Sequence, residues 1–225
     1  MPLRQNILDT LHHYGRTWAS HSIAGKEMAG PPLERVFDDE ESMIVARFLD
    51  FIAQTPDCFL RATLPGHFTG SALVVNKSMS AVLLTHHKKL GLWLQLGGHA
   101  DGHHLLHEVA MAEAYEESGL TNLSFLNYEQ VGIHGHPSDA SPNGPLPFDI
   151  DGHSIPASHK DPSHLHFDVR YVVIAESESM PIVSDESHDV RWFSLAEARA
   201  LTNSRSMHRQ FDKIEWLREA LNLPL

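Results

Sequence analysis

Three glutamates near the end of one predicted helix are the residues best suited to chemistry in this sequence. Helical periodicity predicts a helix from Leu105 to Ser118, closed by Gly119. At about 100° per residue, Glu113, Glu116 and Glu117 share one face of that helix. Like charges at this spacing destabilise a helix by a few tenths of a kcal/mol per pair, and glutamates near a C-terminus oppose the helix dipole. A bound divalent cation would offset both effects, so the spacing predicts a cation site. The alternative is a solvated acidic face.

A histidine-rich strand forms a second candidate group. Strict alternation from His164 to Arg170 places His164, His166, Asp168 and Arg170 on one strand face. We expect this row to face a substrate cleft, where Arg170 holds phosphate in a bidentate manner and His166 and Asp168 contact the substrate. The His-x-His-x-Asp pattern is also typical of transition-metal ligands. The solvent face of an edge strand is the alternative.

A further cluster of histidines precedes the predicted helix, in a chain that has 18 histidines in all. Its members are His99, Asp101, His103, His104 and His107. We expect His99 to contact the substrate, and together these residues would shift metal preference toward Zn²⁺, Ni²⁺ or Co²⁺. A polar loop with surface histidines is the alternative.

The composition excludes several classes of protein. The 225 residues include 17 Lys and Arg against 29 Asp and Glu, a formal net charge of −12. This balance argues against a nucleic acid polymer as the main partner and leaves a small polyanionic substrate. No segment approaches the roughly 18 apolar residues of a membrane span. One cysteine, Cys58, rules out a disulfide framework. The N-terminus reads as an amphipathic helix without the apolar core of a signal peptide, so the cytoplasm is the expected compartment.

The elements that must position these residues fall into two parts. Residues 1–56 read as an N-terminal helical extension that either packs on the rest of the chain or forms a homodimer, and residues 57–225 form the main domain. Helices are expected at 4–24 and 40–54, on either side of a break at 25–32. Gly97-Gly98 should end a strand, and residues 135–162 should form a long functional or mobile loop. Strands are expected at 71–75, 81–85, 93–96, 123–133, 164–174 and 191–193, and two closing helices at 195–202 and 205–221, capped by Ser194 and Ser204.

The glycines and glutamates together resemble the box of the Nudix hydrolase family, G-x5-E-x7-R-E-U-x-E-E-x-G-U, where U is a bulky apolar residue. The matching positions are Gly98, Glu113, Glu116, Glu117, Gly119 and Leu120. Two positions depart, because His104 stands in place of the first Glu and Ala112 in place of Arg. Residues 97–102, Gly-Gly-His-Ala-Asp-Gly, are similar to a bacterial Nudix subgroup with that signature, and the resemblance spans about residues 57–202.

The resemblance implies an α/β fold, an α/β/α sandwich with a mixed sheet, in which the box forms a loop-helix-loop. It implies a metal-dependent hydrolase in which water attacks a small-molecule diphosphate, commonly a nucleoside diphosphate derivative. Glu113, Glu116 and Glu117 would bind Mg²⁺ or Mn²⁺, with a further ligand from the Gly98 carbonyl. Glu113 and Glu117 would then be catalytic. The base that activates water is assigned to Glu186, with Asp185, Asp189 or a box glutamate as alternatives.

The two departures support a second hypothesis. Ala112 cannot orient neighbouring carboxylates as Arg does, and His104 supplies no carboxylate, so metal geometry should be weakened or altered. The chain is then a catalytically weakened binding or sensor module on the same fold. A third hypothesis is a histidine-rich protein that binds a transition metal on this scaffold.

Overall fold

The computed structural model describes residues 2–19, 39–128, 144–158, 161–177, 179–185, 187–221 and 223. Its helices are α1 (Pro2–Ala19), α2 (Asp39–Gln54), α3 (Leu106–Ser118), α4 (Leu195–Ala200) and α5 (Arg205–Ala220). Its strands are β1 (Gly66–Asn76), β2 (Ala81–His87), β3 (Leu92–Leu94), β4 (Leu96–His99), β5 (Leu123–Phe125), β6 (Asp149–Ile155), β7 (His164–Ala175) and β8 (Ser187–Ser194).

Two long parallel strands, β1 and β7, form the centre of one mixed sheet. They pair without interruption from Gly66 opposite Leu165 to Asn76 opposite Ala175. The other edge of β1 pairs antiparallel with β4 and then β2, and the other edge of β7 pairs antiparallel with β6 and then β5. β2 also pairs with β3 and β8. The polar row on β7 therefore lies inside the sheet, and the edge-strand alternative is wrong.

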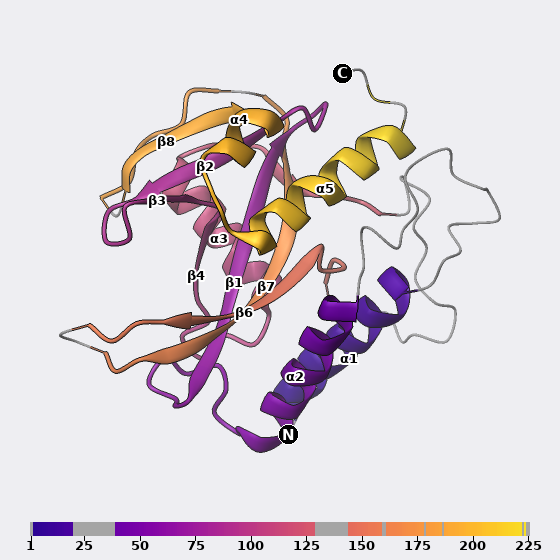
Figure 1. The fold of residues 1–225 in the computed structure, drawn as a ribbon, viewed down its shortest axis with the longest axis vertical. Coiled ribbons are helices and arrows are strands. Elements are labelled where there is room, and N and C mark those ends of the chain that lie inside the picture. Colours follow the sequence, from indigo (N-terminus) through magenta and orange to yellow (C-terminus); the bar gives the residue numbers. More distant parts are fainter. Residues whose placement is uncertain are drawn as a thin grey trace.

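Helices cover both faces of this sheet (Figure 1). α3 lies behind β1 and contacts β1, β4 and β7, while α5 crosses in front of the sheet. The predicted α/β/α sandwich with a mixed sheet is confirmed.

The N-terminal helices pack on the domain, which is one of the two arrangements expected for them. Phe51 of α2 stacks on Phe167 of β7, with ring centroids 3.8 Å apart and planes at 3°. Phe48 packs edge-on against the same ring and is fully buried. Burying a side chain of this size contributes about 1.5–3 kcal/mol, so α2 shares the core of the domain.

The predicted helix caps are confirmed at α3, α4 and α5. Gly119 caps α3 in the left-handed conformation, with φ 63°, and its N–H donates to the Tyr115 carbonyl. Ser194 and Glu197 form a capping box at α4, and the Ser204 hydroxyl accepts from the Met207 N–H at α5.

Gly97 and Gly98 were expected to end a strand, but they lie within β4. They pair with Ser71 and Gly70 of β1. A Cβ at Gly97 would overlap the Cα and side chain of Ser71, and one at Gly98 would overlap the Glu113 carboxylate. The glycines are needed because two neighbours approach the β4 backbone closely.

Two further expectations are corrected. Part of the expected loop at 135–162 is strand β6, whose polar side chains find partners on β7 and α5 and so tolerate a place in the sheet. The strand expected at 123–133 reaches only Phe125, and residues 129–133 lie outside the described part of the chain.

A buried ion network centred on Asp149 joins the two ends of the chain to the sheet. Lys213 of α5 donates to Asp149 Oδ1 at 3.0 Å, to the Phe148 carbonyl at 3.0 Å and to Glu41 of α2. Arg209 forms a two-point contact with Asp149, at 2.7 and 3.0 Å. Burial alone would raise the pKa of Asp149, but Lys213 and Arg209 together hold it below its ordinary value. Charges so deeply buried are stable only when paired.

No described helix combines the length and the apolar character needed to cross a membrane.

Replacing Lys213 with Met should destabilise the fold by about 3–5 kcal/mol, because Asp149 and Glu41 lose a buried cation. Urea unfolding followed by circular dichroism measures this. Lys77→Met is the matched control, since Lys77 pairs with Glu176 at 2.9 Å on the surface and should cost about 0–1 kcal/mol. Equal losses in the two variants would contradict a central role for the network.

Candidate active site

Glu113 and Glu117 of α3 converge on the Gly97-Gly98 backbone of β4. Glu117 is buried, and its Oε2 accepts a hydrogen bond of 2.9 Å from the Gly97 N–H. The half-buried Glu113 carboxylate occupies the space that a side chain at Gly98 would fill. Sequence spacing placed these residues on one helix face, and the structure adds the strand that they contact.

The third glutamate, Glu116, adds a further carboxylate on the same helix. Glu116 is exposed, and α3 is continuous through all three positions. Carboxylates and a backbone carbonyl are the ligands that Mg²⁺ and Mn²⁺ prefer. The residues present therefore fit a hard divalent cation. Ala112, which replaces the Arg of the Nudix pattern, is exposed.

Of the three acids outside the box that could serve as the base that activates water, only Asp185 and Asp189 lie among the described residues. Glu186 lies outside the described residues. The Asp185 backbone carbonyl accepts from Lys88 Nζ at 2.6 Å. Asp189 pairs with Arg191, and this hydrogen bond lowers the pKa of the carboxyl.

Arg170 lies in the buried ion network, a placement different from the phosphate-binding one expected. Its guanidinium donates to Asp168 at 2.7 Å, to Asp149 at 3.1 Å and to Asp151 at 3.1 Å. Arg170 is 4% exposed and Asp168 is 3% exposed. Asp168 also accepts from Thr69 and Ser71 of β1. The guanidinium is thus already matched by three carboxylates.

His99 and His166 lie together with a third histidine, His67, which the sequence analysis did not select. His67 and His166 are direct partners in the β1–β7 ladder, and His99 pairs with Thr69 two residues along β1. The ring centroids of these three histidines are 4.9–5.1 Å apart. Only the β1–β7 register brings His67 to this position, and no local signal shows it.

The three histidines lie on the opposite face of the sheet from the glutamates. Gly98 and Gly70 are direct partners, and both face α3. Successive residues of a strand point to opposite faces, so His99 points away from α3. The histidine cluster and Glu113 are therefore separated by the β4–β1 ladder.

Burial keeps these histidines neutral. Burial, followed by the neighbouring His99 and His164, lowers the pKa of His67 to about 4. Burial and the four surrounding histidines lower the pKa of His166 to about 2. The pKa of His99 is also lowered, chiefly by burial.

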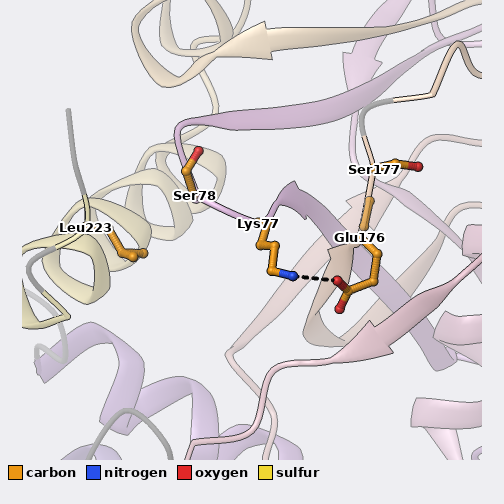
Figure 2. Close-up of a pocket in the computed structure, with 6 residues that line it drawn as sticks. Lys77, Ser78, Glu176, Ser177 and Leu223 are labelled. Carbon is orange, nitrogen blue, oxygen red and sulfur yellow. Dashed lines mark hydrogen bonds and ion pairs between the residues drawn. The ribbon is translucent and has the colours of Figure 1, made fainter.

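A separate hollow lies at the far end of β1 and β7. Figure 2 shows Lys77 and Glu176 joined across it, with Ser78, Ser177 and Leu223 around them. Because Lys77 follows the last residue of β1 and His67 is near its first, about 30 Å of strand separates the hollow from the histidines. It contains none of the candidate site residues.

Comparison with known proteins gives one family. A family model described as the NUDIX domain matches residues 67–214. That segment is about two thirds of the chain and includes nearly all of β1, the whole of α3 and the glutamates. No curated protein matches the chain.

Solved structures resemble the chain at low identity. A NUDIX-family hydrolase from Clostridium perfringens is 25% identical, with 66% of this chain and 96% of that chain covered and a TM-score of 0.45. A Caenorhabditis elegans Ap4A hydrolase is 14% identical, covered to 66% and 94%, with a TM-score of 0.48. The Escherichia coli dihydroneopterin triphosphate pyrophosphohydrolase is 12% identical, covered to 65% and 92%, with a TM-score of 0.44. The family assignment rests on the family model.

Gly98→Ala should weaken Mn²⁺ binding at least about tenfold while the fold is retained, because the new methyl group displaces the flexible end of Glu113. Electron paramagnetic resonance of free Mn²⁺ measures the affinity. Gly97→Ala is the contrasting variant: it meets the backbone of Ser71 and should lower the free energy of unfolding by about 1–3 kcal/mol. Unchanged Mn²⁺ affinity in Gly98→Ala would argue against Glu113 as a ligand.

The stability of the metal-free protein should fall as the pH falls from about 6.5 to about 4. In this range the unfolded chain protonates His67 and His166, whose ordinary pKa is 6.5, whereas the folded protein does not. Each histidine contributes up to about 1.4 kcal/mol per pH unit. Urea unfolding with a chelator present measures the slope, and His67→Asn should make it shallower. The same slope in both proteins would exclude this origin.

Proposed function

The chain belongs to the NUDIX domain family of pyrophosphohydrolases, and from this premise we propose that it hydrolyses the diphosphate linkage of a nucleoside diphosphate derivative or a related small molecule. The observation that carries the proposal is the convergence of Glu113 and Glu117 on Gly97-Gly98. It gives the acidic helix face a fixed position against the sheet.

In this proposal Glu113, Glu116 and Glu117 hold Mg²⁺ or Mn²⁺, with the Gly98 carbonyl as a further oxygen ligand. When bound, the cation neutralises charge on phosphate oxygens and lowers the pKa of water. The protein holds the ligand carboxylates in fixed positions. The Gly97 N–H fixes the Glu117 carboxylate, and β4 is itself held by pairing with β1 from Thr69 to Ala72. Ligands fixed by a sheet give the precise placement that catalysis needs.

Glu186 is the base in this proposal. The segment before it is tethered to α3, because the Ile182 N–H donates to the Ser118 carbonyl at 2.7 Å. Ile182 also packs beside Gly119. The tether places Ile182, four residues before Glu186, next to the end of α3 that carries Glu116 and Glu117. This contact supports an acid from the segment after Ile182 as the group that accepts a proton from water.

A second candidate function is a NUDIX-fold module that binds its ligand with little turnover. The observation in its favour is Ala112, an exposed residue with no charge to offset the adjacent Glu113. In this case the ligand binds with the same metal dependence, and hydrolysis is slow or absent.

Glu117→Gln should reduce hydrolysis at least about 100-fold, a loss of about 2.7 kcal/mol of transition-state stabilisation. The amide keeps the shape of the side chain but removes the charge that binds the cation. The assay measures phosphate or monophosphate release with Mg²⁺ and with Mn²⁺, across ADP-ribose, a dinucleoside polyphosphate and a nucleoside triphosphate.

Glu108→Gln is the matched control, because Glu108 is an exposed glutamate in the first turn of the same helix. It should keep the activity of the unaltered protein. Activity that survives Glu117→Gln would remove the assigned role. Metal-dependent binding of a panel compound without turnover would favour the second candidate.

A further inference from the structure

A cage of nitrogen donors exists on the face of the sheet opposite α3. His67, His99 and His166 come from β1, β4 and β7. Each offers a ring nitrogen, and these atoms all lie within 4.8 Å of one another. Two nitrogens bound to one tetrahedral Zn²⁺ are about 3.4 Å apart, so small ring rotations bring the three atoms to ligating distance.

His67 is a buried polar group that is poorly satisfied. It is 1% exposed, and neither ring nitrogen makes a hydrogen bond of normal geometry among the described residues, although a looser contact with the Thr63 backbone acts to raise its pKa. Buried polar atoms are nearly always satisfied, and an unsatisfied one costs about 1–3 kcal/mol. An ion bound by His67 would remove this cost. Neutral imidazole, the prevailing form of histidine at neutral pH, presents the lone pair that binds metal.

Outer residues hold the cage in place. His164 Nδ1 lies 2.8 Å from the Pro162 carbonyl, an atom that only accepts, so Nδ1 carries the proton. In the neutral ring, His164 Nε2 then accepts a hydrogen bond of 3.2 Å from the His166 Nε2–H, which leaves the Nδ1 lone pair of His166 for an ion. His153, on the other side of His166, is tied to Asp151 at 3.1 Å. Such partners fix the rings of metal-binding histidines.

We propose that His67, His99 and His166 bind one divalent transition-metal ion of the Zn²⁺ class, with an open position beside His164. Imidazole nitrogen favours Zn²⁺, Co²⁺ and Ni²⁺, whereas Mg²⁺ prefers oxygen. The site is distinct from the glutamate site because the β4–β1 ladder lies between them. The ion would join β1, β4 and β7 where β4 positions the glutamates.

The test uses the full chain after removal of metal by a chelator. Equilibrium dialysis against Zn²⁺ with excess Mg²⁺ should show one Zn²⁺ per chain at micromolar free metal, and Co²⁺ should give the visible absorption bands of a tetrahedral site. Zn²⁺ should also raise the midpoint of thermal unfolding. His166→Asn should weaken Zn²⁺ binding more than about tenfold.

Two controls locate the ion. His103→Asn changes an exposed histidine paired with Glu108, and it should bind Zn²⁺ as the unaltered protein does. Glu117→Gln should also keep its Zn²⁺, even where hydrolysis is lost. If His166→Asn does not fold, His99→Gln at the end of β4 replaces it. Absence of tight Zn²⁺ binding, or loss of binding in Glu117→Gln without loss in the histidine variants, would overturn the proposal.

Discussion

The alternation of side chains along β1, and its register with β4 and β7, is the constraint on which both candidate sites depend. Gly70 and its partner Gly98 face α3, where Gly98 leaves room for Glu113, whereas His67 and Thr69 face the other side. A shift of one residue in the pairing of β4 with β1 would move every side chain of β4 to the opposite face of the sheet. His99 would then point at α3, and Gly98 would no longer receive the carboxylate. One ladder thus sets an oxygen-donor site and a nitrogen-donor site back to back.

The buried network around Asp149 keeps this ladder in register with the rest of the chain. Lys213 and Arg209 reach Asp149 from α5, and Arg170 reaches it from β7. The network continues to Asp168, whose carboxylate accepts hydrogen bonds from Thr69 and Ser71 and so links β7 to β1. Asp168 lies two residues after His166 on β7. Buried ions add little net stability compared with apolar packing, but they tolerate few alternative pairings. Here they fix how β6, β7 and α5 meet.

The parts of this structure that were predictable from the sequence are those set by neighbouring residues. The α3 periodicity, the Gly119 cap and the Ser194 capping box depend on residues within one or two turns. Gly97-Gly98 was misread because a glycine pair usually ends a strand, and only the approach of Ser71 and Glu113 shows why glycine is needed inside one. The role of β6 was hidden because its partners, Arg170 and Ser206, are distant in sequence. His67 was missed for the same reason, since its partner is 99 residues away.

The departure at Ala112 takes on a different meaning once the β4 backbone is considered. An arginine in the Nudix pattern can orient neighbouring carboxylates through charge-assisted hydrogen bonds. In this chain the Gly97 N–H orients Glu117, and Gly98 provides the space that receives Glu113. Backbone groups in a paired strand are held more rigidly than a long exposed side chain, and they need no ordering of rotamers. The position of the two carboxylates is therefore secured by the sheet, and the loss of arginine removes local positive charge without removing their placement.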